Sequence, residues 1–248
     1  MRTLSAIIIV KNEAEHIDRC LASLDFVDEI IVLDSGSEDN TVAMCKAYTE
    51  KVFVTDWPGF GPQKNRALAK AQSDWVLSID ADEWVTTDLR TEILTLLQQD
   101  IIPCQAYQTP RLSYFCGQLI RHGDWRSDCP VRLFERTSAE FSDHMVHESV
   151  QVSGKIGKLH AVLEHDAFKN PEEVINKMNL YSSLWAQSAW QRGKHARLHT
   201  AVTHGLWTFL RGYFLFRGFL DGKMGFVLAV SNAQGCYYRY LKLSLLSK

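Results

Sequence analysis

Three carboxylates stand within four residues, directly after a short apolar stretch. Asp80, Asp82 and Glu83 follow residues 75–79, whose length and composition predict a buried strand. In open α/β sheets, ligands bind beyond the carboxyl ends of the strands, so these acids are predicted to lie at a binding edge. Like charges this close repel each other, and a hard divalent cation with oxygen ligands relieves the repulsion. The stretch therefore indicates a site for a metal ion and a diphosphate.

The first hundred residues alternate between strand and helix patterns. Continuous β-branched and apolar runs predict buried strands, and segments with helical spacing separate them. Such alternation is typical of βαβ units, and it predicts a mostly parallel sheet flanked by helices. The predicted strands are residues 4–10, 29–33, 52–54 and 75–79, and the predicted helices are 15–24, 42–48, 63–71 and 87–98.

Polar side chains also follow the first two predicted strands. Glu13 lies in the turn after the first strand and Asp34 ends the second, so both are expected to face the same crevice as Asp80. A carboxylate there can accept hydrogen bonds from a uracil edge or a ribose. Lys64 lies at the start of a helix after a Gly/Pro-rich loop, where it can meet a diphosphate. Together these positions favour a nucleotide pocket.

Four motifs in this region resemble those of a known family. The segments IIIVKNE, VLDSGSEDNT, GPQKNRAL and VLSIDADE occur in the order found in family 2 glycosyltransferases of the GT-A fold. The resemblance implies an inverting transfer of a sugar from a nucleoside diphosphate donor, with Mg²⁺ or Mn²⁺ as cofactor. It places Asp82 on the metal. It assigns contacts with the nucleotide sugar to Glu13, Asp34 and Asp80. We expect further contacts from Val10, Asn12, Lys64, Ala81 and Arg132, with an acceptor phosphate as the alternative partner of Arg132.

An inverting transfer is a single displacement, which requires a base on the acceptor side. The resemblance implies a carboxylate in the second half of the chain. We expect it to be Glu148, because Arg132-Leu133-Phe134 and His147-Glu148 resemble the R-L-F and H-E pattern of a bacterial subgroup. The E-D pair of many family members is absent here, so Asp124 and Asp128 remain alternative bases. His165 is a further candidate metal ligand.

The second half of the chain differs from the first. Residues 104–165 alternate aromatic, polar and turn residues, which predicts antiparallel strands and functional loops, and Asn170-Pro171 is a strong helix start. We expect a catalytic domain at 1–168, with a nucleotide-sugar half at 1–100 and an acceptor half at 101–168. Residues 169–248 are expected to form a helical, membrane-associating extension.

The C-terminal segment is basic and aromatic. From Arg192 to the end it holds nine Lys/Arg and one acid, Asp221, a net charge of +8, whereas the rest of the chain carries −10. Aromatic residues beside basic ones are typical of helices that lie in a membrane interface, and no stretch reaches the length of a spanning helix. Six cysteines without a C-x-x-C pair and no signal-peptide pattern indicate a cytoplasmic protein. We therefore expect a peripheral protein on the inner face of the cytoplasmic membrane.

The family resemblance continues into this segment. Residues 218–226 (GFLDGKMGF) look like the G-F-x-D-G-x-x-G-F run of lipopolysaccharide core glucosyltransferases. This implies UDP-glucose as the donor and a lipid-anchored inner-core heptose as the acceptor. Another envelope polysaccharide or lipid-linked acceptor, or a non-catalytic membrane-bound nucleotide-binding protein, remains an alternative. A Rossmann dehydrogenase is disfavoured because no G-x-G-x-x-G is present.

Overall fold

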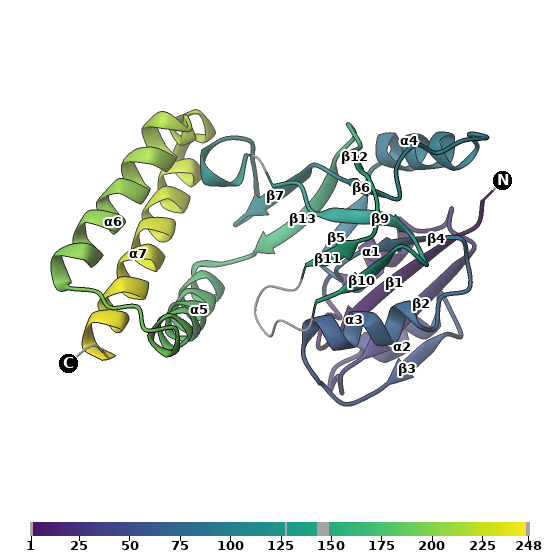
Figure 1. Cartoon of the computed structure of the whole chain (residues 1–248), viewed down its shortest axis with the longest axis horizontal. Helices are drawn as coiled ribbons and strands as arrows, with labels where there is room; N and C mark the ends of the chain where they lie inside the picture. The colour runs from purple at the N-terminus through teal and green to yellow at the C-terminus, as the bar shows by residue number, and fades with distance from the viewer. Residues whose placement is uncertain (1, 127, 143–148, 247–248) are drawn as a thin grey trace. The chain divides into compact units, whose positions relative to one another are not determined.

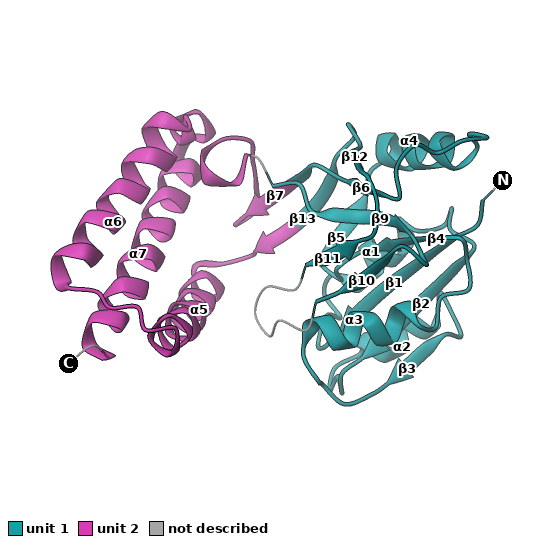
Figure 2. Cartoon of the chain, in the orientation of Figure 1, with its two compact units in different colours: residues 1–111, 128–165 teal, residues 112–127, 166–248 magenta. Residues whose placement is uncertain are grey.

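The structure is a computed structural model, which describes residues 2–126, 128–142 and 149–246. The chain divides into two compact units that interleave along the sequence (Figure 2). Unit 1 comprises residues 1–111 and 128–165, and unit 2 comprises residues 112–127 and 166–248. Residues 112–127 thus group with the C-terminal helices. The predicted functional division into 1–168 and 169–248 stays a prediction.

A seven-stranded sheet is the centre of unit 1 (Figure 1). Its order is β12-β6-β9-β4-β1-β2-β3, in which β4, β1, β2 and β3 run parallel and β9 runs antiparallel to β4 and β6. The predicted α/β fold with a mostly parallel sheet is therefore confirmed. The strands are β1 (Leu4–Val10), β2 (Glu29–Asp34), β3 (Val52–Val54), β4 (Trp75–Ser78), β6 (Ala106–Gln108), β9 (Val131–Glu135) and β12 (Ile156–Lys158).

Helices pack on both faces of this sheet, and β1 shows why its sequence is apolar throughout. Ala6 and Ile8 of β1 belong to the core on the face of α1 and α4, whereas Ile7 belongs to the core on the face of α3. A strand buried on both faces needs apolar residues at successive positions, not at alternate ones. The helices of unit 1 are α1 (Ile17–Ala22), α2 (Thr41–Lys46), α3 (Phe60–Leu68) and α4 (Thr87–Leu97).

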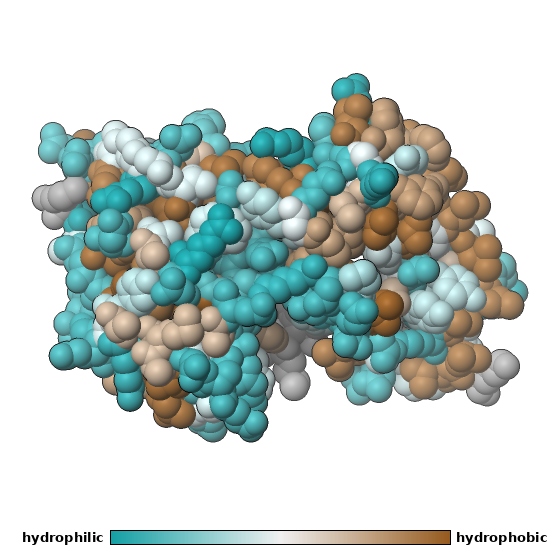
Figure 3. Space-filling model, turned by 180° about the vertical axis from the view of Figure 1, so that it is seen from behind, coloured by the Kyte–Doolittle hydropathy of each residue, from teal (hydrophilic) through white to brown (hydrophobic). Residues whose placement is uncertain are grey.

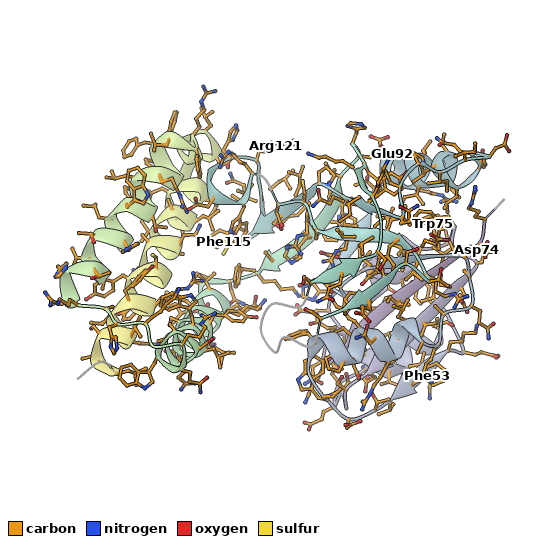
Figure 4. All side chains as sticks on the ribbon, viewed as in Figure 1. Phe53, Asp74, Trp75, Glu92, Phe115 and Arg121 are labelled. Atoms are coloured by element: carbon orange, nitrogen blue, oxygen red, sulfur yellow. The ribbon has the colours of Figure 1, made fainter. Side chains whose placement is uncertain are left out.

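Shorter strands complete unit 1. Strand β5 (Glu83–Val85) pairs antiparallel with residues 163–165 of β13 (Leu163–Phe168), which brings His165 opposite Glu83. Strands β10 (Ala139–Phe141) and β11 (Val150–Val152) form an antiparallel pair. Asp74 and Trp75, labelled in Figure 4, mark the amino end of β4, whereas Asp80 follows its carboxyl end. The two ends of the same strands therefore present different sets of polar side chains.

Unit 2 is mainly helical. Strands β7 (Arg111–Phe115) and β8 (Gln118–Ile120) form a hairpin, and Phe115, Ile120, Val174 and Leu228 form a buried cluster. The predicted helix start is confirmed, because the Asn170 side chain accepts a hydrogen bond from the Glu173 amide. The helical segments are η1 (Gly123–Trp125), α5 (Pro171–Gln191), α6 (Leu198–Leu210), η2 (Arg211–Leu215), η3 (Gly218–Asp221) and α7 (Gly222–Leu246).

The GFLDGKMGF segment holds unit 2 together. Asp221 is buried, and its Oδ2 accepts the amide N–H of His122 at 2.8 Å while its Oδ1 lies 2.8 Å from His122 Nδ1. A Cβ on Gly225 would lie 1.9 Å from the Gly218 carbonyl oxygen, so this contact between η3 and α7 requires glycine. The sequence singled this segment out by resemblance, and its aspartate and glycines have a structural role within the unit.

Candidate active site

Asp80 stands at the centre of a cluster of charged side chains at the carboxyl end of β4. Its Oδ1 lies 2.9 Å from Lys64 Nζ of α3, and its Oδ2 lies 2.5 Å from Arg132 Nη2 of β9. The Lys64 and Arg132 side chains are only 5% and 8% exposed, whereas that of Asp80 is 32% exposed. Three residues that the sequence assigned to the nucleotide sugar therefore meet at one point.

The charges in this cluster shift the pKa of its members. Burial by itself would raise the pKa of Asp80, but the Arg132 and Lys64 cations outweigh it and hold that pKa well below its ordinary value. Burial would lower the pKa of Arg132, yet Asp80 and Glu83 raise it further above its usual range. Asp80 and Arg132 are therefore charged at neutral pH, and two nearly buried basic side chains face the edge where ligands bind.

Glu83 and Arg111 join the cluster, although neither was predicted to contact the nucleotide sugar or the metal individually. Glu83 Oε1 accepts hydrogen bonds from Arg111 Nη1 at 2.7 Å and from Arg132 Nη2, and Glu83 is fully buried. Arg111 also makes two contacts with Asp128, at 2.7 and 2.6 Å. Glu83 stands in the acidic motif itself, so its position was a usable signal. Arg111 lies in a segment without a motif.

Asp82 and His165 form a second pair beside this cluster. Their Oδ2 and Nε2 atoms are 3.3 Å apart, and their side chains are 25% and 15% exposed. An oxygen and an imidazole nitrogen at this separation fit two ligands of one Mg²⁺ or Mn²⁺ ion. Such ions take one or two protein ligands and complete their shell with phosphate oxygens and water. No group of three or more His, Cys, Asp or Glu side chains that could hold a metal ion occurs among the described residues.

The ends of β1 and β2 are joined by hydrogen bonds between their loops. Asn12, at φ 56°, donates its amide N–H to Ser37 Oγ and accepts the Glu38 amide through its side chain. Asp34 is fully buried, and its carboxylate accepts the amides of Gly36 and Ser37, each at 2.9 Å. The structure thus shows Asp34 shaping its own loop. Its predicted contact with the nucleotide stays a prediction.

A cavity of about 400 Å³ opens at the end of β1. Val10 and Glu13, both predicted nucleotide-sugar contacts, line it together with Trp57 and Phe60. The two rings meet edge to face with centroids 4.8 Å apart and are 45% and 40% exposed. Exposed aromatic faces beside a polar strand end suit the stacking of a nucleobase. The sequence analysis missed both residues, although two aromatics in a Pro/Gly-rich loop before a helix were a signal.

A larger cavity, of about 530 Å³, lies at the amino ends of the strands. Its lining includes Asp25, Asp28, Glu29 and Glu50, with Lys51 as the basic member. Such an acidic lining repels a diphosphate, so size alone does not identify the binding site. The smaller cavity lies at the carboxyl edge, and its Phe60 belongs to the same helix, α3, as Lys64 of the cationic cluster. This cavity therefore fits a nucleotide better.

The predicted catalytic base is not part of the described structure. Glu148 lies in residues 143–148, outside the described ranges. Of the alternatives, Asp128 is bound by Arg111 in unit 1, and Asp124 is bound in unit 2 by Arg211, with 2.8 Å between Oδ1 and Nη2. Ala81 is buried within the turn between the two aspartates. The identity of the base therefore stays a prediction.

Comparisons with known proteins identify the family of this chain. Residues 5–145 match the family described as Glycosyl transferase family 2. An uncharacterised glycosyltransferase of Rickettsia typhi is 34% identical over 100% of this chain and 88% of its own length. A glycosyltransferase of Rhizobium meliloti, LpsC, named for lipopolysaccharide core biosynthesis, is 31% identical over 96% and 93%.

A solved structure adds a more distant likeness. Glucosyl-3-phosphoglycerate synthase from Mycobacterium tuberculosis, in complex with Mn²⁺ and UDP-glucose, is 30% identical over 44% of each chain, with a TM-score of 0.38. The family match spans more than half of this chain, and both relatives are named glycosyltransferases. The chain belongs to glycosyl transferase family 2 and is a glycosyltransferase.

Proposed function

We propose that this enzyme transfers glucose from UDP-glucose to an inner-core heptose of lipopolysaccharide or lipooligosaccharide, with inversion at the anomeric carbon. The proposal of a nucleoside diphosphate donor rests on the cluster in which Lys64 and Arg132 both bind Asp80. Nearly buried cations at a ligand-binding edge suit a diphosphate, because the phosphate oxygens replace the water that burial removes. The acceptor half rests on the name of the LpsC relative, over nearly the full length of both chains.

The reaction is a single displacement at the anomeric carbon. The acceptor hydroxyl oxygen forms the new glycosidic bond, the bond to the diphosphate oxygen breaks, and UDP leaves with the bonding electron pair. The hydroxyl proton passes to a carboxylate, for which Glu148 is our candidate. Lys64 and Arg132 bind the diphosphate and stabilise the charge that develops on it.

A divalent cation fits this site. Asp82 and His165 would hold Mg²⁺ or Mn²⁺, and the bound ion supplies further neutralisation of the leaving diphosphate. The Trp57 and Phe60 faces would stack on the uracil. These residues bind and orient the donor, whereas the acceptor side contributes the base.

We also propose that unit 2 attaches the enzyme to an anionic membrane surface, on the cytoplasmic face of the inner membrane. Figure 3 shows hydrophobic residues gathered over the half of the view that holds unit 2. No helix in the described ranges is both long and apolar enough to cross a bilayer. The exposed apolar side chains include Leu198, Val202, Leu206, Trp207, Phe214, Leu215, Phe219, Leu220 and Phe226.

The charge of this region suits an anionic bilayer. Exposed Arg217 and Lys223 flank η3, and Asp221, the only acid after residue 191, is buried in the structure. Each basic side chain near such a surface contributes about 1 kcal/mol to binding. Replacing Phe214 and Leu215 with Ser should abolish sedimentation with phosphatidylglycerol vesicles. The same change at Ile101 and Ile156, exposed in unit 1, should preserve it. Equal binding by both double variants would contradict this attachment.

A panel of UDP-sugars with deacylated inner-core acceptors tests the reaction. We expect UDP-glucose to give a β-linked product on an acceptor that ends in heptose. Transfer only to a different envelope glycan would favour the alternative acceptor class. Tight UDP binding without transfer or donor hydrolysis would favour the non-catalytic alternative.

A further inference from the structure

Glu83 occupies an unusual position between the backbone of the acidic turn and two arginines. Its Oε2 accepts the Asp80 amide N–H at 3.0 Å, and its own amide donates to the Asp80 carbonyl at 3.0 Å. Its Oε1 accepts from Arg111 and Arg132. One fully buried carboxylate therefore fixes both the turn and the side chains that face it.

Arg132, one of the two arginines that Glu83 binds, has a buried N–H donor that needs an acceptor. Among the described residues, Arg132 Nε is buried and has no acceptor, while Nη2 is shared between Asp80 and Glu83. A buried donor without an acceptor is costly, and it points to an oxygen-bearing ligand or water in the complete site. Glu83 supports this arrangement, because it accepts a hydrogen bond from Arg132 and orients the guanidinium in the absence of that ligand.

A diphosphate changes the balance of charges in this cluster. Asp80 is paired with both Lys64 and Arg132, so an arriving diphosphate competes with Asp80 for the same two cations. Glu83 lies on the buried side of Arg132 and is not exposed, so it can remain bound throughout. Because Glu83 keeps the Arg132 side chain in place, Arg132 loses fewer rotamers when it binds the phosphate oxygens.

We propose that Glu83 is a positioning residue for the donor diphosphate, which it serves by holding Arg132, Arg111 and the Asp80–Asp82 turn in their binding geometry. This inference rests on the proposed donor site. It assigns Glu83 no contact with the substrate. Its effect should therefore appear in donor affinity and in the KM for the donor, and only weakly in the KM for the acceptor.

The chain offers a matched control for this carboxylate. Glu29 has a side chain that is 10% exposed, binds Lys51 and accepts hydrogen bonds from Ser5 Oγ and the Gln72 amide. It lies at the amino end of β2, away from the carboxyl edge. Glu29→Gln and Glu83→Gln each remove one negative charge from a carboxylate that three donors reach, although Glu29 is less buried and binds one cation where Glu83 binds two. Both variants therefore report the cost to stability. Only Glu83→Gln should weaken the binding of UDP.

The test measures UDP affinity by calorimetry for both variants, with Mn²⁺ and separately with EDTA. Loss of supporting residues around a binding site weakens affinity on the order of 10–100-fold, and we expect that range for Glu83→Gln in both buffers. Glu29→Gln should match the wild type. Glu83→Asp keeps the charge and should restore part of the affinity.

Two outcomes separate the inference from the function on which it rests. Wild-type UDP affinity in Glu83→Gln would overturn the positioning role while leaving the donor site intact. Failure of the wild-type protein to bind UDP would overturn the donor site itself. If Glu83→Gln does not fold, Arg111→Gln tests the same network, because it removes one of the two arginines that Glu83 holds. An unchanged UDP affinity there would also contradict the role.

Discussion

The two ends of the central sheet both carry ion-paired carboxylates, yet they differ in how many cations surround them. At the amino end, Glu29 is paired with one lysine, Lys51, whose side chain is 41% exposed. At the carboxyl end, Lys64 and Arg132 are nearly buried and both meet Asp80. Burying ion pairs contributes little to stability, so a concentration of buried cations needs another reason. An anionic ligand supplies it.

The strand direction explains why the two ends can have such different roles. Because β1, β2 and β4 are parallel, all their carboxyl ends open on one edge and all their amino ends on the other. Asp34 is the last residue of β2, and the loops after β1 and β4 carry Asn12 and Asp80. The amino edge is stabilised by local hydrogen bonds, such as that from the Leu4 amide to Asp28 Oδ2 at 2.7 Å. One edge is therefore arranged for binding and the other for folding.

The largest difference should come from Asp82. We expect Asp82→Ala to reduce metal-stimulated transfer on the order of a thousandfold, since the variant loses a carboxylate of the proposed metal site. Its thermal unfolding should change little, because the side chain is partly exposed in a turn. Steady-state rates over a range of Mn²⁺ concentrations check this. Normal turnover would remove Asp82 from the metal site.

Glu29 should show the opposite behaviour, with an effect on stability and none on transfer. Burial raises its pKa, but Lys51, Ser5 and the Gln72 amide lower it to a net value of about 2. The folded pKa lies below the unfolded value, so the stabilisation is present above about pH 4.3 and is lost as the pH falls toward 2. Glu29→Gln should reduce the free energy of unfolding by about 2 kcal/mol at pH 7.

Denaturant unfolding of the wild type and Glu29→Gln at several pH values checks this prediction. The difference between the two proteins should shrink as the pH falls toward 2. A difference that is independent of pH would show that the Glu29 charge does not stabilise the fold.

The smallest effect should come from the aromatic loop at the carboxyl edge. Trp57→Ala removes one aromatic face from the cavity beside Val10. Because a stacking ring is lost, the affinity for UDP should fall about tenfold. Tyr48, which is 40% exposed and borders the acidic cavity at the amino edge, provides the control. Tyr48→Ala should leave UDP affinity unchanged. If a fluorescence titration shows equal losses of UDP affinity in Trp57→Ala and Tyr48→Ala, the placement of the uracil at the Trp57 cavity is contradicted.

Much of this site was predictable because it follows local patterns. The apolar run before Asp80 predicted its strand, and the parallel sheet then brought the strand ends together. Glu83 and Arg111 were harder to predict, because their roles depend on the pairing of distant residues: β5 and β9 bring Glu83 and Arg132 to the same point. Aromatic pairs such as Trp57 and Phe60 also lack a periodic signal. Long-range pairing, not local propensity, decided these positions.

The most direct test compares one lysine from each edge. Calorimetric titration with UDP should show micromolar affinity for the wild type and for Lys51→Met, and a loss on the order of tenfold or more for Lys64→Met. Circular dichroism confirms that each variant is folded. Equal UDP affinity in the two variants would contradict the claim that the carboxyl edge holds the donor diphosphate.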